Sequence, residues 1–341
     1  MIRFALIGTG TIAEQHAKAI QTTPDSQLIA VRSSDKDRAE AFAKKFNIPR
    51  AYTNYEELLE DKDIDAVDIV TVNNIHAELG IAAANAGKHV IVEKPIDTSE
   101  RKAEELIKTC KQHNVKLSVI SQHRFDHALL ALKELLINRA LGKPLLANIS
   151  IKWHRDQHYY NSSQAWRKQQ ETAGGGALMI QAIHHLDLLL WLLGDVETVI
   201  GKTSKQKHDI SVEDTAIALL RFRNGALATI EASTAVPKTL NDRLEIHGEK
   251  GSAVLTKHKL AHRLTLHNTT LSTLNKIKTQ LTTYKKGTIK NQIQDFVTAI
   301  KEDKQPRVTG EDGLRALKTI QSIYTSEKLK KEVKVPSQTK E

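Results

Sequence analysis

The chain has 341 residues, which is long for one hydrophobic core, because cores stop growing at about 250–300 residues. We therefore expect two domains. At 40% hydrophobic and 26% charged residues, the composition is that of an ordinary soluble globular protein. The net charge of +10 could suit nucleic acid, an anionic membrane or a phosphorylated small molecule. Basic residues are spread along the chain, densest in 257–290, and no arginine-aromatic block suits base stacking, so a solvated basic surface is favoured.

The single cysteine, Cys110, excludes disulfides within the chain and any cysteine-based zinc site. It stands in a helical pattern and is expected to pack. The chain begins directly with a strand-like run, without the order of a secretory signal. The apolar run "LDLLLWLLG" is too short to span a membrane. We expect a cytoplasmic protein with no membrane and no nucleic-acid partner.

The first 121 residues alternate between short apolar runs and stretches with helical spacing. Runs such as "RFALIG", "QLIAVRS", "DAVDIVTV" and "HVIVE" are each followed by a segment such as "TIAEQHAKAIQ". This alternation predicts a parallel sheet with helices on both faces. Gly87 and Asn114 suit helix C-caps, and Thr98-Ser99 offers a capping hydroxyl for the helix after Pro95.

After residue 121 the pattern becomes that of an α+β domain. "KPLLANISIKWHR" alternates like a strand with one wet face. A polar and aromatic loop at 156–176 leads into a long apolar helix, "ALMIQAIHHLDLLLWLLG". Strand-like segments between 196 and 267 are joined by the short turns "RNG" and "GEKG", which is hairpin spacing. Two helical segments close the chain before a polar tail.

The strongest local motif is Gly8-Thr9-Gly10-Thr11-Ile12-Ala13, a GxGxxA. Alone it is weak, but here a strand precedes it and a helix follows. Its glycines allow a tight turn, and the helix N-terminus can hold a pyrophosphate. A plain strand-helix turn is the alternative, and the whole alternating series favours a dinucleotide site in a doubly wound Rossmann domain.

The end of the second strand bears on the choice of cofactor. An NAD site usually has an acid here, but the position is Ser33, flanked by Arg32 and Ser34. A hydroxyl beside cations would suit a 2′-phosphate, which favours NADP slightly. The alternative is that Asp35, two residues later, serves an NAD ribose.

Two further strand ends carry polar side chains where ligands of doubly wound sheets bind. Thr71, Asn73 and His76 follow the "VDIV" strand; Asn73 or Asn74 could also be an N-cap, and a lone histidine here is more often a packing or surface residue. Glu93-Lys94-Pro95 follows "HVIV". A lysine there can take a substrate hydroxyl proton, and Glu93 can orient it. A simple ion pair is the alternative, and Lys-Pro raises the chance of a cis bond.

A triple glycine, 174–176, feeds the apolar helix that contains His184 and His185. Either histidine could serve as an acid or base, although adjacent histidines in an apolar helix are often core or interface residues. Gln181 shares a face with His184 at helical spacing. A metal site is disfavoured, because neighbouring histidines point in different directions and no third ligand clusters with them.

Together these motifs resemble the Gfo/Idh/MocA oxidoreductases. The matching features are the GxGxxA, Asn73 with His76, Glu93-Lys94-Pro95, "GGGALMIQAIHHLD" and the closing "DFVTAI…TGEDGLRAL", in order over nearly the whole chain. The resemblance implies a Rossmann domain at 1–121 and an α+β substrate domain with an open, largely antiparallel sheet at 122–287. It also implies that helices at 288–335 pack back on the first domain, and that the second sheet forms a homodimer or homotetramer.

The resemblance implies a dehydrogenase acting on a sugar or cyclitol, with NAD or NADP. Lys94 resembles the catalytic lysine of the family and His184 its catalytic histidine. Ile180 stands where the family commonly has Asp or Asn, four residues before that histidine, and Gln181 is a possible substitute. The implied cofactor-binding residues are Gly8, Gly10, Thr11, Ile12, Arg32, Ser33, Thr71, Asn73, His76, Glu93 and Lys94.

Within the family, "SQHRFDHALLALK", "KWHRDQHYYNSSQAWRK" and "RLEIHGEKGSAVL" look most like a branch that includes nucleotide-sugar 3-dehydrogenases. The substrate residues this implies are Arg124, Tyr160, Trp166, Arg167, Gln181 and His184, although Trp166-Arg167 could equally anchor a loop. Lys168 stands where the family often has Gly. An inositol or simple-sugar dehydrogenase, and a non-catalytic NAD(P)-binding sensor suggested by Ile180, remain alternatives.

Overall fold

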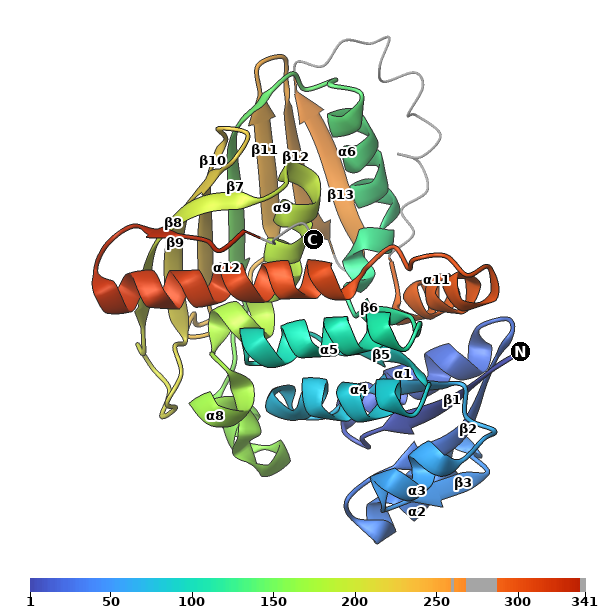
Figure 1. The fold of residues 1–341 in the computed structure, drawn as a ribbon. Helices are drawn as coiled ribbons and strands as arrows, with labels where there is room; N and C mark the ends of the chain where they lie inside the picture. The colour runs from blue at the N-terminus through green and yellow to red at the C-terminus, as the bar shows by residue number, and fades with distance from the viewer. Residues whose placement is uncertain (259–260, 268–286, 338–341) are drawn as a thin grey trace. The chain divides into compact units, whose positions relative to one another are not determined.

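The computed structural model describes residues 1–258, 261–267 and 287–337 (Figure 1). Contacts divide the chain into two compact units, residues 1–121 with 288–314 and residues 122–287 with 315–341. Helix α12 (Gly310–Leu329) continues across this division after Leu314. Most of the basic stretch 257–290 falls outside the described residues.

The first unit is built on a six-stranded parallel sheet in the order β3-β2-β1-β4-β5-β6. This is the doubly wound order, in which the strand sequence reverses between β1 and β4 and leaves a ligand crevice at the carboxyl ends. The predicted Rossmann domain is confirmed. The strands are β1 (Ile2–Ile7), β2 (Ser26–Arg32), β3 (Arg50–Tyr52), β4 (Ala66–Ile69), β5 (His89–Val92) and β6 (Leu117–Val119).

Helices cover both faces of this sheet (Figure 1). Buried side chains of α1 and α11 form one core cluster with Phe4 and Leu6 of β1, whereas α4 packs closely on α5. Gly80 of α4 allows this close approach, because a Cβ there would come 2.7 Å from a Leu106 methyl group. The helices are α1 (Thr11–Thr22), α2 (Lys36–Phe46), α3 (Tyr55–Glu60), α4 (His76–Asn85), α5 (Glu100–Gln112) and α11 (Ile289–Lys301).

The predicted helix ends are confirmed. Ser99 caps α5 by accepting from Lys102 N–H, and Gly87 and Asn114 take positive φ angles of 73° and 53° after their helices. The alternating pattern missed β3 and α3. A three-residue strand and a six-residue helix are too short to display a period.

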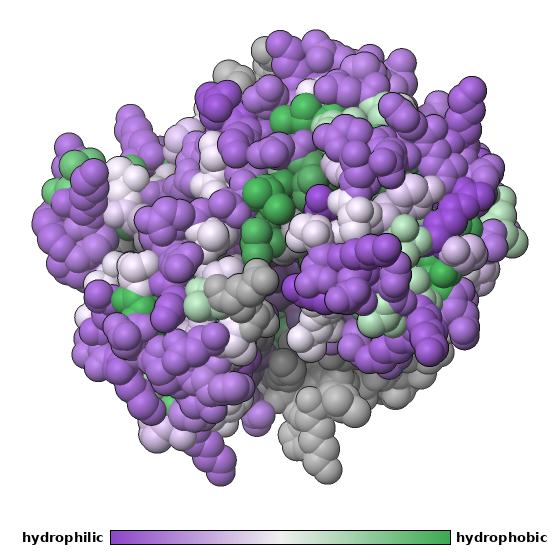
Figure 2. Space-filling model, turned by 90° about the horizontal axis from the view of Figure 1, so that it is seen from below, coloured by the Kyte–Doolittle hydropathy of each residue, from purple (hydrophilic) through white to green (hydrophobic). Residues whose placement is uncertain are grey.

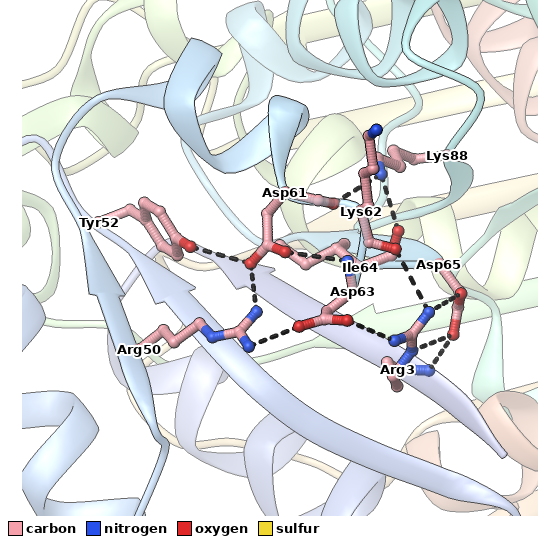
Figure 3. A network of polar contacts seen from close by, with 9 residues as sticks. All are labelled: Arg3, Arg50, Tyr52, Asp61, Lys62, Asp63, Ile64, Asp65 and Lys88. Atoms are coloured by element: carbon pink, nitrogen blue, oxygen red, sulfur yellow. Dashed lines mark hydrogen bonds and ion pairs between the residues drawn. The ribbon is translucent and has the colours of Figure 1, made fainter.

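A charged network lies where the strands of this sheet begin (Figure 3). Arg3 reaches Asp63 and Asp65, and Arg50 reaches Asp61 and Asp63, over 2.5–3.0 Å. The acids belong to the short segment before β4, so the network ties that segment to β1 and β3. These charges stand at the opposite strand ends from the GxGxxA turn and are expected to be structural.

The second unit has an eight-stranded sheet in the order β13-β12-β11-β7-β10-β9-β8-β14. Only β7 and β10 pair in parallel; the other pairs are antiparallel, as predicted. The turns "RNG" and "GEKG" form hairpins, with Gly225 at φ 91°. The strands are β7 (Pro144–Lys152), β8 (Val196–Ser204), β9 (Thr215–Phe222), β10 (Leu227–Ser233), β11 (Arg243–Gly248), β12 (Ser252–His258), β13 (Ala261–His267) and β14 (Val333–Lys334).

The polar loop at 156–176 contains short helical segments. They are α7 (Gln157–Asn161), η3 (Ser163–Lys168) and α8 (Gln170–Ala173). The remaining helical segments of this unit, besides α12, are η2 (Gln122–Phe125), α6 (His127–Ile137), η4 (Ala177–Ala182) and α9 (Ile183–Leu193). The predicted long apolar helix is therefore divided: η4 is a π-helix and α9 an α-helix.

By length and composition alone, the stretch Gln170–Leu193 is long and apolar enough to cross a membrane. Its most apolar window is 89% buried inside the protein, however, which is typical of a core helix. Most of its hydrophobic side chains are therefore buried by packing within the protein.

Apolar side chains are exposed on one face of the second sheet. Ile217 and Leu219 of β9 alternate with buried residues, and the neighbouring strands add Ile200, Leu227 and Leu146, each 45–55% exposed. A shallow groove of about 310 Å³ lies among them. By contrast, the view in Figure 2 shows a largely hydrophilic face with hydrophobic residues in a few small groups.

Candidate functional site

The turn between β1 and α1 is shaped for close approach by a ligand. Gly8 has φ +117°, and a Cβ there would lie 2.6 Å from the carbonyl oxygen of Val70, at the end of β4. No side chain other than hydrogen fits. Gly10 has an ordinary φ of −76°, and a Cβ on it would meet nothing within 4 Å among the described residues. The first glycine is thus required by the fold, while the second leaves open space at the helix end.

The residues of this turn fit a dinucleotide diphosphate. Helix α1 begins at Thr11 and Ile12, and in the described part of the chain no side chain caps its N-terminus. Its first N–H groups therefore remain available, together with the positive end of the helix dipole. The buried Thr9 Oγ1 also lacks a hydrogen-bond partner among the described residues. Donors and an open cradle are what a diphosphate needs.

The end of β2 carries the residues expected to face an adenosine ribose. Arg32 Nε donates to Thr53 O over 3.1 Å, and its guanidinium lies 6.0 Å from the Tyr55 ring centre. Ser33 is 7% exposed, and its hydroxyl accepts from Asp35 N–H. The alternative acid, Asp35, caps α2 by accepting from Arg38 N–H over 3.1 Å. One Asp35 oxygen is therefore committed to the helix.

The segment after β4 places His76 inside the protein. This side chain is fully buried at the start of α4, with Nδ1 2.8 Å from Pro95 O and Nε2 3.3 Å from Thr71 O. Burial lowers its pKa. His76 links the segments that follow β4 and β5, and its predicted contact with the cofactor stays a prediction. Asn73 is 4% exposed, and the buried Asn74 Oδ1 has no partner among the described residues.

The segment after β5 holds Lys94 between fixed neighbours. Glu93 Oε2 accepts the Lys94 backbone N–H over 3.0 Å. The Lys94-Pro95 peptide bond is cis, as anticipated. Pro95 O lies in hydrogen-bond range of His76, and Asp97 accepts from the N–H groups of Ala77 and Ser99. The Lys94 side chain is half-buried, at the carboxyl end of β5.

The sequence analysis missed a buried ionic group behind Glu93. His16 of α1 is fully buried, with Nδ1 2.7 Å from Asp68 Oδ2 and Nε2 3.1 Å from Glu93 Oε1. Two signals could have revealed it. His16 shares the buried face of α1 with Ala13, Ala17 and Ile20, and Asp68 interrupts an apolar central strand.

In the second unit, the two adjacent histidines have different environments. His185 is 1% exposed, and its Nε2 lies 3.5 Å from Asp242 Oδ2. His184 is half-buried, with its ring edge-on to His123 at 5.8 Å between centres. His184 is therefore the better placed of the two to meet a ligand.

The start of the helical segment that carries His184 is fixed by Glu213. Its carboxylate accepts from the N–H groups of Gly176 and Leu178 over 2.8 Å. Ile180 and Gln181 lie within the π-helix η4, which holds more residues per turn than an α-helix. The direction of Gln181 relative to His184 is therefore not fixed by α-helical spacing alone.

Two predicted substrate residues have internal roles. Arg124 is 4% exposed and makes a bidentate ion pair with Asp187, over 2.8 and 2.6 Å. Tyr160 is fully buried, and its hydroxyl lies 2.7 Å from Thr234 Oγ1. Both side chains are therefore buried and paired in this conformation, and their contact with a substrate stays a prediction.

Tyr159, the residue before Tyr160, lies close to two arginines and a glutamine. The guanidinium groups of Arg155 and Arg167 lie 5.0 and 4.9 Å from the Tyr159 ring centre. Gln181 Nε2 donates to the Tyr159 hydroxyl over 3.2 Å. Within the described residues, the buried Gln181 Oε1 and Arg155 Nε have no partner. Arg167 also lies over Trp166, at 4.8 Å, so Arg167, Trp166 and Gln181 gather around Tyr159.

Comparisons with known proteins agree with this description. Among solved structures, the WlbA dehydrogenase from Bordetella pertussis, in complex with NADH and UDP-GlcNAcA, has a TM-score of 0.90 at 27% identity, covering 99% of this chain and 98% of that one. The 1,5-anhydro-D-fructose reductase of Ensifer adhaerens is 29% identical, covering 94% of both chains. The myo-inositol 2-dehydrogenase of Thermotoga maritima is 28% identical, covering 93% of both.

Family comparison covers both units. The "Oxidoreductase family, NAD-binding Rossmann fold" matches residues 2–121, and the "Oxidoreductase family, C-terminal alpha/beta domain" matches residues 133–335. These matches agree with the parallel sheet of the first unit and the largely antiparallel sheet of the second. The chain belongs to the Gfo/Idh/MocA family of oxidoreductases.

Proposed function

We propose that this protein is an NAD(P)-dependent dehydrogenase that transfers a hydride to or from a hydroxyl-bearing ring carbon of a sugar. The main observation behind this proposal is the position of Lys94, which is fixed at the carboxyl end of β5. In the same sheet, the turn after β1 fits a dinucleotide diphosphate. Ligands of doubly wound sheets bind at these carboxyl ends. Similar proteins include dehydrogenases named for inositol and levoglucosan, which are also polyhydroxylated rings.

A nicotinamide cofactor, when bound, accepts or supplies the hydride. Side chains of the protein must transfer the hydroxyl proton. Lys94 Nζ, as a neutral amine, would accept the hydroxyl proton while the C–H bond breaks, and its ammonium would return that proton in reduction. We assign His184 as the second acid-base group. Gly8, Gly10, Thr11 and Ile12 would hold the diphosphate, with Thr71, Asn73 and Glu93 at the neighbouring strand ends.

We further propose a nucleotide sugar as substrate, oxidised at C3. Arg155 and Arg167, both near the Tyr159 ring, supply the fork-shaped donors that phosphate or carboxylate groups require. Two similar solved structures, from Bordetella pertussis and Chromobacterium violaceum, contain NADH and UDP-GlcNAcA. An inositol or simple sugar, which bears no anionic group, would leave these arginines without a role.

Either NAD or NADP is proposed, with Arg32, Ser33 and Ser34 favouring the phosphorylated form. Asp35 is partly engaged as a helix cap, which supports this preference. The affinities for NADH and NADPH, measured by fluorescence on the wild type and Arg32→Ala, test it. Loss of NADPH affinity alone is expected, and equal effects on both would contradict it.

The exposed apolar face of the second sheet is proposed to form the contact of a homodimer or homotetramer. Ile217 and Leu219 on β9 lie beside Ile200 and Leu227 on the flanking strands. A face of this kind usually marks an interaction surface.

The deciding experiment is an absorbance assay of both cofactors against UDP-sugars, simple sugars and inositols. Turnover with a UDP-sugar is expected, and Lys94→Ala should remove turnover while keeping cofactor affinity. Near-normal turnover by Lys94→Ala would refute the role of the lysine. Cofactor-induced thermal stabilisation without turnover on any compound would instead favour a sensor.

A further inference from the structure

Four residues form a continuous chain of contacts from the sheet interior to Lys94. Asp68 Oδ2 on β4 lies 2.7 Å from His16 Nδ1, and His16 Nε2 lies 3.1 Å from Glu93 Oε1. The other Glu93 oxygen, Oε2, accepts the backbone N–H of Lys94 over 3.0 Å. Asp68 and His16 are 0% exposed and Glu93 is 8% exposed. Both oxygens of Glu93 are therefore held in place.

The protonation state of His16 follows from its geometry. A neutral imidazole has one N–H, but both ring nitrogens of His16 face carboxylate oxygens, which accept only. Burial alone would lower the pKa of His16, but Asp68 and then Glu93 raise it to about 10. Burial would raise the pKa of Glu93, but His16 and Lys94 lower it. The ring is an imidazolium between two carboxylates.

We propose that His16 is a positioning residue for Lys94. Held between Asp68 and Glu93, it orients the Glu93 carboxylate, and this carboxylate fixes the backbone from which the lysine side chain extends. The inference rests on the proposed role of Lys94. Through His16, helix α1, which we propose binds the diphosphate, also supports the segment after β5 that carries Lys94.

A purely stabilising role explains the arrangement less well. Buried ion pairs often contribute no more stability than apolar residues of similar volume, because their desolvation is costly. Three buried ionisable side chains, from α1, β4 and the end of β5, instead give directional contacts. His76 performs a comparable task on the other side of Lys94, with its Nδ1 2.8 Å from Pro95 O. The segment that carries Lys94 is thus contacted by two buried histidines.

The experiment compares His16→Gln with His89→Gln. His89 begins β5, the strand that ends before Glu93, and it is also a half-buried histidine with a backbone partner, Lys116 N–H. His16→Gln should lower kcat at least about tenfold, as expected for a displaced catalytic group, while the cofactor Kd changes by less than about twofold. His89→Gln should leave kcat unchanged.

A second readout does not depend on turnover. The rate at which an amine-reactive reagent labels Lys94, followed by peptide mass spectrometry, should change in His16→Gln and stay constant in His89→Gln. Unchanged labelling together with unchanged kcat would overturn the proposal, as would a loss of kcat matched by an equal loss of cofactor affinity. If Lys94→Ala keeps its activity, the catalytic role of Lys94 fails, while the labelling result still decides whether His16 positions it.

Asp68→Asn provides a second variant in case His16→Gln fails to fold. It keeps the side-chain shape and the contact of Glu93 with Lys94 N–H, but removes the charge that holds the second proton on His16. The ionisable groups facing this ring are Asp68 and Glu93, with Lys94 and His76 around Glu93. Asp68→Asn should make kcat fall with rising pH inside the assay range. A pH profile identical to that of the wild type would contradict the proposal.

Discussion

The Tyr324 hydroxyl donates to Glu213 Oε1 over 2.9 Å, on the same carboxylate that receives the N–H groups of Gly176 and Leu178. A Cβ on Gly176 would lie 1.7 Å from the backbone oxygen of Glu213, so the two segments are in direct contact. Glu213 therefore serves as the N-terminal anchor of the helical segment that carries Gln181 and His184.

Glu213→Ala is expected to lower the free energy of unfolding by roughly 2–4 kcal/mol, because it leaves three buried donors without an acceptor. Tyr324→Phe removes one donor only and should cost about 1 kcal/mol. Urea unfolding of the two variants checks this order. Equal losses would show that the backbone contacts of Glu213 contribute little.

Substitutions at the two glycines of the GxGxxA turn should have different effects, one on stability and the other on cofactor binding. Gly8→Ala should lower the free energy of unfolding by at least roughly 2 kcal/mol, since its φ of +117° and the contact with Val70 O both exclude a methyl group. Gly10→Ala should leave the melting temperature unchanged and weaken NADH binding by about tenfold or more, through the space it fills. Calorimetric melting and fluorescence titration measure the two effects. A destabilised Gly10→Ala protein would contradict the distinction.

The stability of the protein should depend on His16 in a defined pH window. The pKa of His16 is about 10 in the folded protein, against an ordinary value of 6.5. Its contribution is fully present below about pH 6.5 and is lost as the pH rises towards 10. The difference in unfolding free energy between wild type and His16→Gln should narrow across this window. A constant difference would mean that His16 is not charged.

Adjacent tyrosines should behave in opposite ways. Tyr159→Leu should raise KM for an anionic substrate by about tenfold, because it removes the ring that both Arg155 and Arg167 contact. Tyr160→Phe loses the contact with Thr234 and should lower the free energy of unfolding by about 1 kcal/mol with KM unchanged. Steady-state kinetics and urea unfolding distinguish them, and the reverse pattern would restore Tyr160 as the substrate residue.

The open sheet face can be tested by charge. Ile217→Glu should dissociate the proposed oligomer, because a carboxylate would be buried without a partner in the contact. Leu240→Glu is the matched control, since Leu240 is similarly exposed, at 54% against 55%, but lies outside the strands. Light scattering on both variants gives the mass. An unchanged mass for Ile217→Glu would exclude this face.

Local sequence signals predicted the parts of the site that are continuous in the chain. The GxGxxA turn and the Glu93-Lys94-Pro95 segment need only a strand, a turn and a few residue types, and both are found at the expected strand ends. The contact of His16 with Asp68 joins residues 52 positions apart, so spacing within one element could not reveal it. Tyr159 and Tyr160 lie in the short helix α7, whose five residues are too few to show from the sequence which side is buried.

The π-helix η4 also has a consequence for comparing this chain with its relatives. Ile180 differs from the polar residue expected four positions before His184, but "four positions before" means one turn only in an α-helix. Within Ala177–Ala182 the directions of the side chains therefore do not follow α-helical spacing. Whether His184 has lost its polar partner, or another residue of the helix supplies it, therefore depends on the geometry of the helix as well as on the residue at position 180.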